Sequence, residues 1–105
     1  MESYKILVIR FSSIGDIVLT TPIVRALKQQ LKNVEIHYLT KKTNYSLLQN
    51  NKYIDKIHLL EEGDLYSKLR KNKFDYIVDL HNNLRTFKIK AMLRVKSKAF
   101  PKLNL

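Results

Sequence analysis

The sequence alternates short apolar runs with stretches in which apolar residues recur every three or four positions. Strands are predicted at residues 5–11, an apolar and β-branched run, at 34–40, at 54–60, where apolar and polar residues alternate, and at 74–80. The periodic stretches, each of which predicts an amphipathic helix, lie at residues 16–31, 43–50, 64–71 and 85–93. Strands that alternate strictly with helices form a parallel sheet joined by right-handed crossovers. The pattern therefore predicts an α/β fold, a Rossmann-like parallel sheet with flanking helices.

Several polar residues and prolines mark the expected ends of these elements. Pro22 lies inside the first periodic stretch, where it should kink the helix or mark its tightened first turns. Asn33 is the expected stop of that helix, and Thr43 or Asn44 is the expected cap of the next one. The closing segment, residues 95–105, is expected to begin a fifth strand.

A sheet of four or five strands without a closing helix after residue 94 would keep an exposed apolar edge and a partly covered face. At 105 residues the chain has the length of one domain. We therefore expect residues 1–105 to form a single lobe that is truncated, the first part of a larger α/β domain or of a two-lobed protein.

The composition excludes several classes of protein and of site. A hydrophobic content of 45% with two glycines and two prolines is that of a globular chain. Without cysteine there are no disulfides, thiol nucleophiles or cysteine-based metal sites, and neither His37 nor His58 has a second ligand at metal-binding spacing. The first apolar run is too short for a signal peptide or a membrane span, so a cytoplasmic protein is expected.

The charge is strongly positive and unevenly placed. The net charge is +11, and residues 80–105 hold seven basic side chains and no acidic one. This excess predicts attraction to a polyanion such as nucleic acid, anionic lipid or a phosphorylated substrate. A nucleic-acid module would need stacking aromatics, and the basic segment offers only Phe87 and Phe100. A receiver-like or flavodoxin-like domain would need an acidic pocket or a hydroxyl-rich phosphate loop, which the first turn does not supply.

The turn after the first strand carries the first candidate chemistry. Residues 11–16 join a buried strand to a helix N-terminus, a place that favours an anion, but they lack the three glycines of a dinucleotide fingerprint and the Gly-Lys ending of a P-loop. Asp16 has two interpretations that remain open. Either it complements the helix dipole with Ser12 or Ser13 as the N-cap, or it is a general base that accepts a proton from a substrate hydroxyl.

The loop after the fourth predicted strand, residues 79–86, carries the second candidate site. Arg85 has two interpretations. Its guanidinium either makes bidentate contacts to a phosphate or carboxylate, or it is a solvated side chain in the first turn of a helix. Asn82 or Asn83 either contacts a ligand or caps the following helix. His81 is either a ligand-binding residue or a hydrogen-bonded structural one.

Four segments resemble the amino-terminal portion of glycosyltransferase family 9, the ADP-heptose:lipopolysaccharide heptosyltransferases: IRFSSIGDIVLTTPIVRALKQQ, VEIHYLT, YIDKI and FDYIVDLHNNLRT. The resemblance spans nearly the whole chain, and its most specific part is S-S-I-G-D followed six residues later by Pro22. It implies the GT-B fold, in which two Rossmann-like lobes enclose the active site. This chain would be the amino-terminal, acceptor-binding lobe, and the donor-binding lobe would be absent from it.

The same resemblance implies roles for individual residues. Asp16 matches the aspartate that deprotonates the acceptor hydroxyl for inverting transfer. The residues expected to bind the acceptor are Ser12, Ser13, Gly15, His81, Asn82, Asn83, Arg85 and Thr86. The donor would be ADP-heptose held by the absent lobe, and no separate cofactor and no metal is expected.

The resemblance also implies partners. We expect an anionic acceptor of the lipopolysaccharide inner core, a peripheral position at the inner face of the cytoplasmic membrane, and no specific nucleic acid. The 105-residue chain alone should be inactive in heptose transfer. Glu61 and Glu62 follow the third predicted strand where heptosyltransferases carry several arginines, so the acceptor stays open. The alternative function is a non-catalytic basic module that binds nucleic acid or another polyanion.

Overall fold

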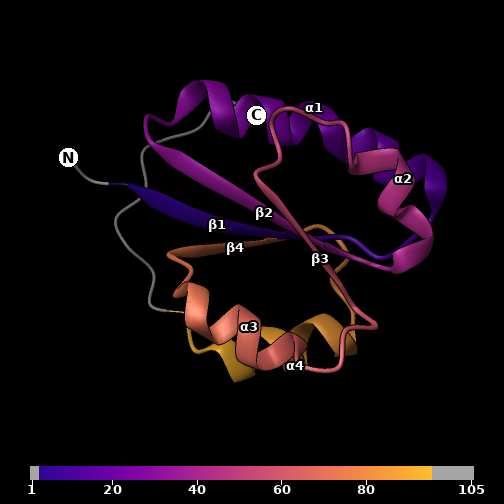
Figure 1. The fold of residues 1–105 in the computed structure, drawn as a ribbon, viewed down its shortest axis with the longest axis vertical. Helices are drawn as coiled ribbons and strands as arrows, with labels where there is room; N and C mark the ends of the chain where they lie inside the picture. The colour runs from indigo at the N-terminus through magenta and orange to yellow at the C-terminus, as the bar shows by residue number, and fades with distance from the viewer. Residues whose placement is uncertain (1–2, 96–105) are drawn as a thin grey trace.

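The structure, a computed structural model, describes residues 3–95 and contains one parallel sheet with helices on both faces. The strands, in the order β3-β2-β1-β4, are β1 (Tyr4–Ile9), β2 (Val34–Thr40), β3 (Lys56–Leu59) and β4 (Tyr76–Asp79). The helices are α1 (Ile14–Gln30), the 3-10 turn η1 (Lys42–Asn44), α2 (Tyr45–Leu48), α3 (Leu65–Asn72) and α4 (Leu84–Leu93). In Figure 1, α1 and α2 cover one face of the sheet, and α3 and α4 cover the other. The predicted Rossmann-like α/β fold is confirmed.

β1 is the central strand and its side chains fill two separate cores. Ile6 and Val8 face the core beneath α1 and α2, whereas Leu7 and Ile9 face the core beneath α3 and α4. All four side chains are fully buried, as the apolar run predicts for a strand covered on both faces. Each contributes about 1.5–3 kcal/mol through the removal of apolar surface from water. The site that follows β1 therefore begins from a rigid support.

α1 runs as one helix through Pro22. Proline has no N–H to donate to the carbonyl four residues earlier, that of Val18, and the Thr21 hydroxyl donates to this oxygen instead at 2.8 Å. The helix ends at Gln30 with Leu31 as its C-cap in an extended conformation, so it stops before Asn33, which takes the left-handed conformation with φ 56° in the turn that leads to β2.

The segment predicted as a helix over 43–50 is instead the turn η1 followed by the single turn of α2. Asn44 does not cap a helix with its side chain. Its buried amide donates to the Phe11 carbonyl at 2.7 Å and to Thr40 Oγ1 at 3.0 Å, which ties the loop after β1 to the end of β2. The expected fifth strand falls largely on 96–105, outside the described residues.

Candidate functional site

The candidate site lies between the carboxyl ends of β1 and β4. β1 has β2 on one side and β4 on the other, and the helices that follow β1 and β4 leave on opposite faces of the sheet. The two loops therefore diverge and leave a crevice, which is where open α/β sheets bind their ligands. The sequence places the S-S-I-G-D turn at one wall of this crevice and residues 80–85 at the other.

Asp16 stands in the first turn of α1, with its side chain about half exposed (49%). Its Oδ2 atom accepts from the Ser13 hydroxyl at 2.8 Å and from the Ser13 backbone N–H at 3.4 Å, and it pairs with the Arg10 guanidinium at 3.0 Å. These hydrogen bonds, with the Ser13 contacts first and the Arg10 charge after them, lower the pKa of Asp16. Among the described residues, each of these hydrogen bonds to Asp16 is made to Oδ2. Oδ1 therefore takes part in none of them and is left for a ligand.

Arg10 joins the two walls of the crevice. One terminal nitrogen donates to the Leu80 carbonyl at the end of β4 at 2.8 Å, and the other pairs with Asp16. The neighbouring residue Phe11 is buried, and its backbone N–H donates to His81 Nδ1 at 3.4 Å while the two rings lie 4.7 Å apart. These contacts cross about 70 residues of sequence and fix Asp16 relative to the second loop.

His81 is neutral and oriented by the loop it contacts. Its Nδ1 accepts the Phe11 N–H, so the ring proton sits on Nε2. Partial burial, and after it the charge of Arg10, lowers the pKa of His81, and Lys41 acts in the same direction. The Arg85 guanidinium lies 5.9 Å from the centroid of the Phe11 ring. Three cations thus surround the crevice, which favours an anionic ligand there.

The turn between β4 and α4 is held by its own polar side chains. Asp79 Oδ1 accepts the backbone N–H groups of His81 and Asn82, and Asn82 is exposed with φ 53°. Asn83 is the N-cap of α4: its Oδ1 accepts the Thr86 N–H at 3.0 Å, and Thr86 Oγ1 accepts the Asn83 N–H at 2.9 Å. Because Thr86 is fully buried within this capping box, it holds the loop rather than facing the crevice.

The structure thus brings the two predicted loops together and divides their residues by role. Ser12, Ser13, Gly15, Asn82 and Arg85 are exposed. A side chain at Gly15 would meet no atom within 4 Å, so the packing of the chain does not itself require glycine there and the space in front of it is open.

Sequence reasoning missed the positioning roles of Arg10, Phe11 and Asn44. The one available signal was Arg10 itself, a cation placed inside the apolar run directly before S-S-I-G-D. His37 and His58 do lie in β2 and β3 as predicted, away from the crevice. Among residues 3–95, no three His, Asp or Glu side chains are grouped to hold a metal ion.

Comparison with known proteins gives one sequence relative and several similar structures. No protein-family model matches the chain. Lipopolysaccharide heptosyltransferase 1 from Campylobacter coli is 27% identical over an alignment of 109 positions, which covers 96% of this chain and 32% of the relative. The chain therefore spans about a third of the length of this relative.

The solved structures agree on the fold. A glycosyltransferase family 9 protein from Veillonella parvula superposes with a TM-score of 0.75 at 21% identity, over 88% of this chain and 30% of that one. The ADP-heptose heptosyltransferase II of E. coli gives a TM-score of 0.77 at 22% identity, over 87% and 28% of the two chains. The predicted resemblance is confirmed: this chain is similar in sequence to a lipopolysaccharide heptosyltransferase and has the Rossmann-like fold found in glycosyltransferase family 9.

Proposed function

We propose that residues 1–105 form the acceptor-binding amino-terminal lobe of an inverting glycosyltransferase, which transfers heptose or a related sugar from a nucleotide-sugar donor to the lipopolysaccharide inner core. The observation that carries this proposal is the environment of Asp16 in the crevice between the carboxyl ends of β1 and β4. Its carboxylate is fixed through Oδ2 by Ser13 and Arg10, is kept ionised by a lowered pKa, and has Oδ1 outside these contacts on a side chain that is about half exposed.

In this reaction Asp16 acts as the general base. Its Oδ1 accepts the proton of an acceptor hydroxyl while the hydroxyl oxygen forms a bond to the anomeric carbon of the donor. The bond between that carbon and the diphosphate oxygen breaks, and the nucleoside diphosphate leaves with the bonding electron pair. Arg10 holds the carboxylate in position, because it is anchored at the same time to the Leu80 carbonyl.

The remaining crevice residues are suited to an anionic acceptor. Arg85 is exposed at the start of α4, and Lys41 lies close enough to His81 to affect its pKa. Phosphate and carboxylate groups of an inner-core acceptor would pair with these cations. In the proposed site the acceptor contacts are made by Ser12, Ser13, Gly15, His81, Asn82 and Arg85, while Asn83 and Thr86 keep the second loop in shape.

The donor site is proposed to lie outside residues 1–105, since the chain spans 32% of the heptosyltransferase that it resembles in sequence. ADP-heptose is the proposed donor. The chain alone should bind the acceptor and transfer no sugar, since the groups that hold a nucleotide diphosphate would come from the donor-binding lobe.

Transfer in a protein that joins this chain to a donor-binding lobe tests the role of Asp16. Asp16→Asn should reduce kcat by at least about 10³-fold with little change in acceptor affinity, because the amide cannot accept the proton. Asp64→Asn, a change of an exposed aspartate at the start of α3, is the matched control and should keep full activity. Full turnover by Asp16→Asn would refute the assignment of the base.

Acceptor binding by the 105-residue chain tests the lobe itself. Titration with a phosphorylated inner-core oligosaccharide should shift the NMR signals of Asp16 and His81, and Arg85→Ala should weaken binding about tenfold through loss of a charge-assisted contact. Arg70→Ala, an exposed arginine on α3, is the control and should bind as the unchanged chain does. Equal, steeply salt-dependent binding to any DNA would instead support the polyanion module.

A further inference from the structure

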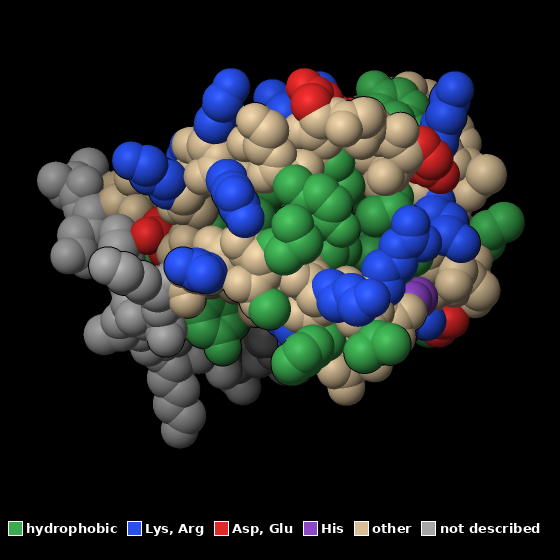
Figure 2. All heavy atoms as spheres, turned by 90° about the horizontal axis from the view of Figure 1, so that it is seen from below, with side chains coloured by type: hydrophobic (Ala, Val, Ile, Leu, Met, Phe, Trp, Pro, Cys, Tyr) green, Lys and Arg blue, Asp and Glu red, His purple; other side chains and the backbone are tan. Residues whose placement is uncertain are grey.

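A hollow of about 570 Å³ lies between α1 and the loop that joins α2 to β3. Thr21, Pro22 and Arg25 of α1 form one wall, and Leu47 of α2 with residues 50–53 forms the other. Figure 2 shows the opposite face, where hydrophobic side chains gather over α3 and α4 with Lys and Arg side chains around them, and none of the described helices on either face is long and apolar enough to cross a bilayer. None of the residues that line the hollow belongs to the crevice between β1 and β4, so a ligand in the hollow would occupy a second site.

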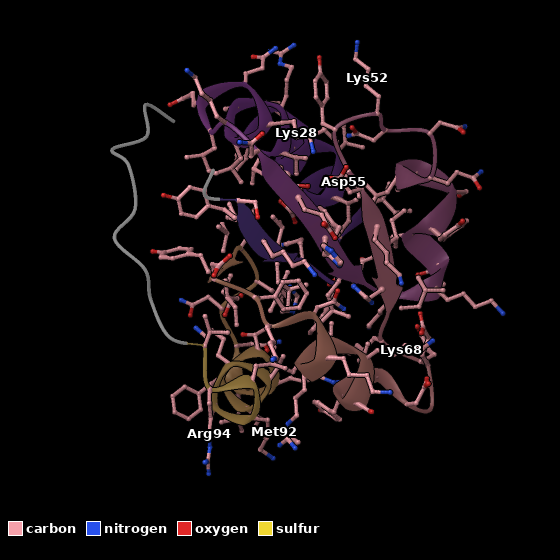
Figure 3. The ribbon with its side chains drawn as sticks, turned by 60° about the vertical axis from the view of Figure 1, so that its left-hand side comes forward. Lys28, Lys52, Asp55, Lys68, Met92 and Arg94 are labelled. Carbon is pink, nitrogen blue, oxygen red and sulfur yellow. The ribbon has the colours of Figure 1, made fainter. Side chains whose placement is uncertain are left out.

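The two walls of the hollow are fixed to one another by an ion pair. Lys28, about one turn after Arg25 on α1, pairs with Asp55 at 2.6 Å. The same carboxylate accepts the Ile36 N–H of β2 at 2.7 Å, which holds the end of the loop against the sheet. In Figure 3, Lys28 and Asp55 lie close together, and Lys52 extends outward beyond them. The hollow is therefore formed before a ligand enters it, as most small-molecule sites are.

The polar side chains of the lining favour an anion. Arg25 and Lys52 are exposed, and among residues 3–95 neither forms an ion pair. Asn51 Oδ1 accepts the Tyr53 backbone N–H at 2.8 Å, so the two N–H groups of the Asn51 amide are left for a ligand. None of the described residues that line the hollow is acidic. The hollow therefore offers two positive charges and amide donors to a group with several acceptor oxygens.

The rest of the lining is apolar and suits an organic group. Leu47 has 43% of its surface exposed, and it faces the hollow together with Pro22. The Tyr53 ring packs against the core beneath α1, and the Lys52 ammonium group lies 5.2 Å from its centroid. This cation–π contact holds the Lys52 charge at the border of the hollow. A phosphate monoester presents both matching parts, because it joins an organic group to a phosphate of about −1.5 to −2 charge at neutral pH.

We propose that this hollow binds a phosphate monoester, whose phosphate is held by Arg25, Lys52 and the Asn51 amide and whose organic group covers Leu47 and Pro22. The volume of about 570 Å³ lies in the range of roughly 300–1,000 Å³ that is usual for small-molecule sites. Sugar phosphates and nucleoside monophosphates share this chemistry, and the test below separates them. The binding does not depend on the role of Asp16, because no residue of the crevice takes part in it.

The test is titration of the 105-residue chain with glucose 6-phosphate and with AMP, followed by NMR. At least one of these esters should shift the backbone signals of Asn51 and Lys52, and the tighter of the two identifies the organic group. Inorganic phosphate should bind at least about threefold more weakly than that ester, since it has no group to cover Leu47. Equal affinity for inorganic phosphate would reduce the site to one for a bare anion. A ligand that shifts only signals of the crevice, such as those of His81, would overturn the proposal.

Three variants separate the proposed contacts from the net charge of the chain. Arg25→Gln should weaken binding of the ester at least about tenfold, because a charge-assisted contact to the phosphate is lost. Arg70→Gln is the matched control, since it removes the same charge from an exposed arginine on α3, and it should bind normally. Leu47→Ser should weaken the ester about threefold and leave inorganic phosphate unchanged. Equal losses for the two arginine variants, or no shift of Asn51 and Lys52 at millimolar ester, would overturn the proposal.

Discussion

Acidification should destabilise this protein through a buried histidine pair between β2 and β3. His37 Nδ1 and His58 Nε2 lie 2.8 Å apart, and both rings are buried beside Phe74. His37 Nε2 lies 2.6 Å from Glu35 Oε1, and an ionised carboxylate only accepts, so His37 Nε2 carries the proton and Nδ1 accepts from His58. A proton added to His37 Nδ1 would face the His58 N–H and break this bond.

The magnitude follows from the pKa of His58. Burial, with the nearby His37 and Lys56 charges after it, lowers this pKa from 6.5 to about 4. Between these values the unfolded chain binds a proton that the folded chain does not, so the free energy of unfolding falls as the pH falls. At pH 5 the loss is about 2 kcal/mol. Burial also lowers the pKa of His37, which adds to the loss.

Urea unfolding followed by circular dichroism at pH 7, 6 and 5 measures this loss. The window lies above the range in which Asp16, Glu62 and Asp79 titrate, since their pKa values are lowered. His58→Gln keeps a side-chain N–H for His37 and should remove about 2 kcal/mol of the pH dependence. Unfolding free energies that agree within about 0.5 kcal/mol at pH 7 and pH 5 would refute the reasoning.

Three further changes test single contacts. Tyr38→Phe removes the buried hydroxyl 2.7 Å from Thr20 Oγ1 and should cost about 1 kcal/mol in urea unfolding. Because burial raises the pKa of Tyr38 to about 12, its phenolate absorbance should appear only near that pH. Asn83→Ala removes the side-chain cap of α4 and should cost about 1 kcal/mol in the same assay. Arg10→Met should raise the pKa of Asp16, measured by carbon NMR; an unchanged pKa would contradict their coupling.

The order of strands and helices could be predicted from the sequence because the pattern of buried residues determines that order. The segment 34–40 coincides with β2, in which every residue except Glu35 is buried, as a strand covered on both faces requires. The prediction of a helix over 43–50 is confirmed only for Tyr45–Leu48, because the stretch is too short for periodicity to decide the conformation of its first residues. There the buried hydrogen bonds of Asn44 to Phe11 and Thr40 hold the backbone in a 3-10 turn.

The two loops of the candidate site could be predicted from the sequence, but the contact between them could not. The motif around Asp16 identified the first loop, and the polar residues after β4 identified the second. Their contact depends on the strand order β3-β2-β1-β4, which a single sequence does not specify. For the same reason the bonds of Arg10 to the Leu80 carbonyl, and of Phe11 to His81, could not be foreseen.

The structural role of Asp16 and its proposed catalytic role are compatible, because a carboxylate has two oxygens. Oδ2 serves the fold, since it holds Ser13 at the start of α1 and pairs with Arg10. Oδ1 is left for the proposed chemistry, and the contacts at Oδ2 keep the group ionised and fixed in direction. The helix start therefore supplies the positioning that a general base needs.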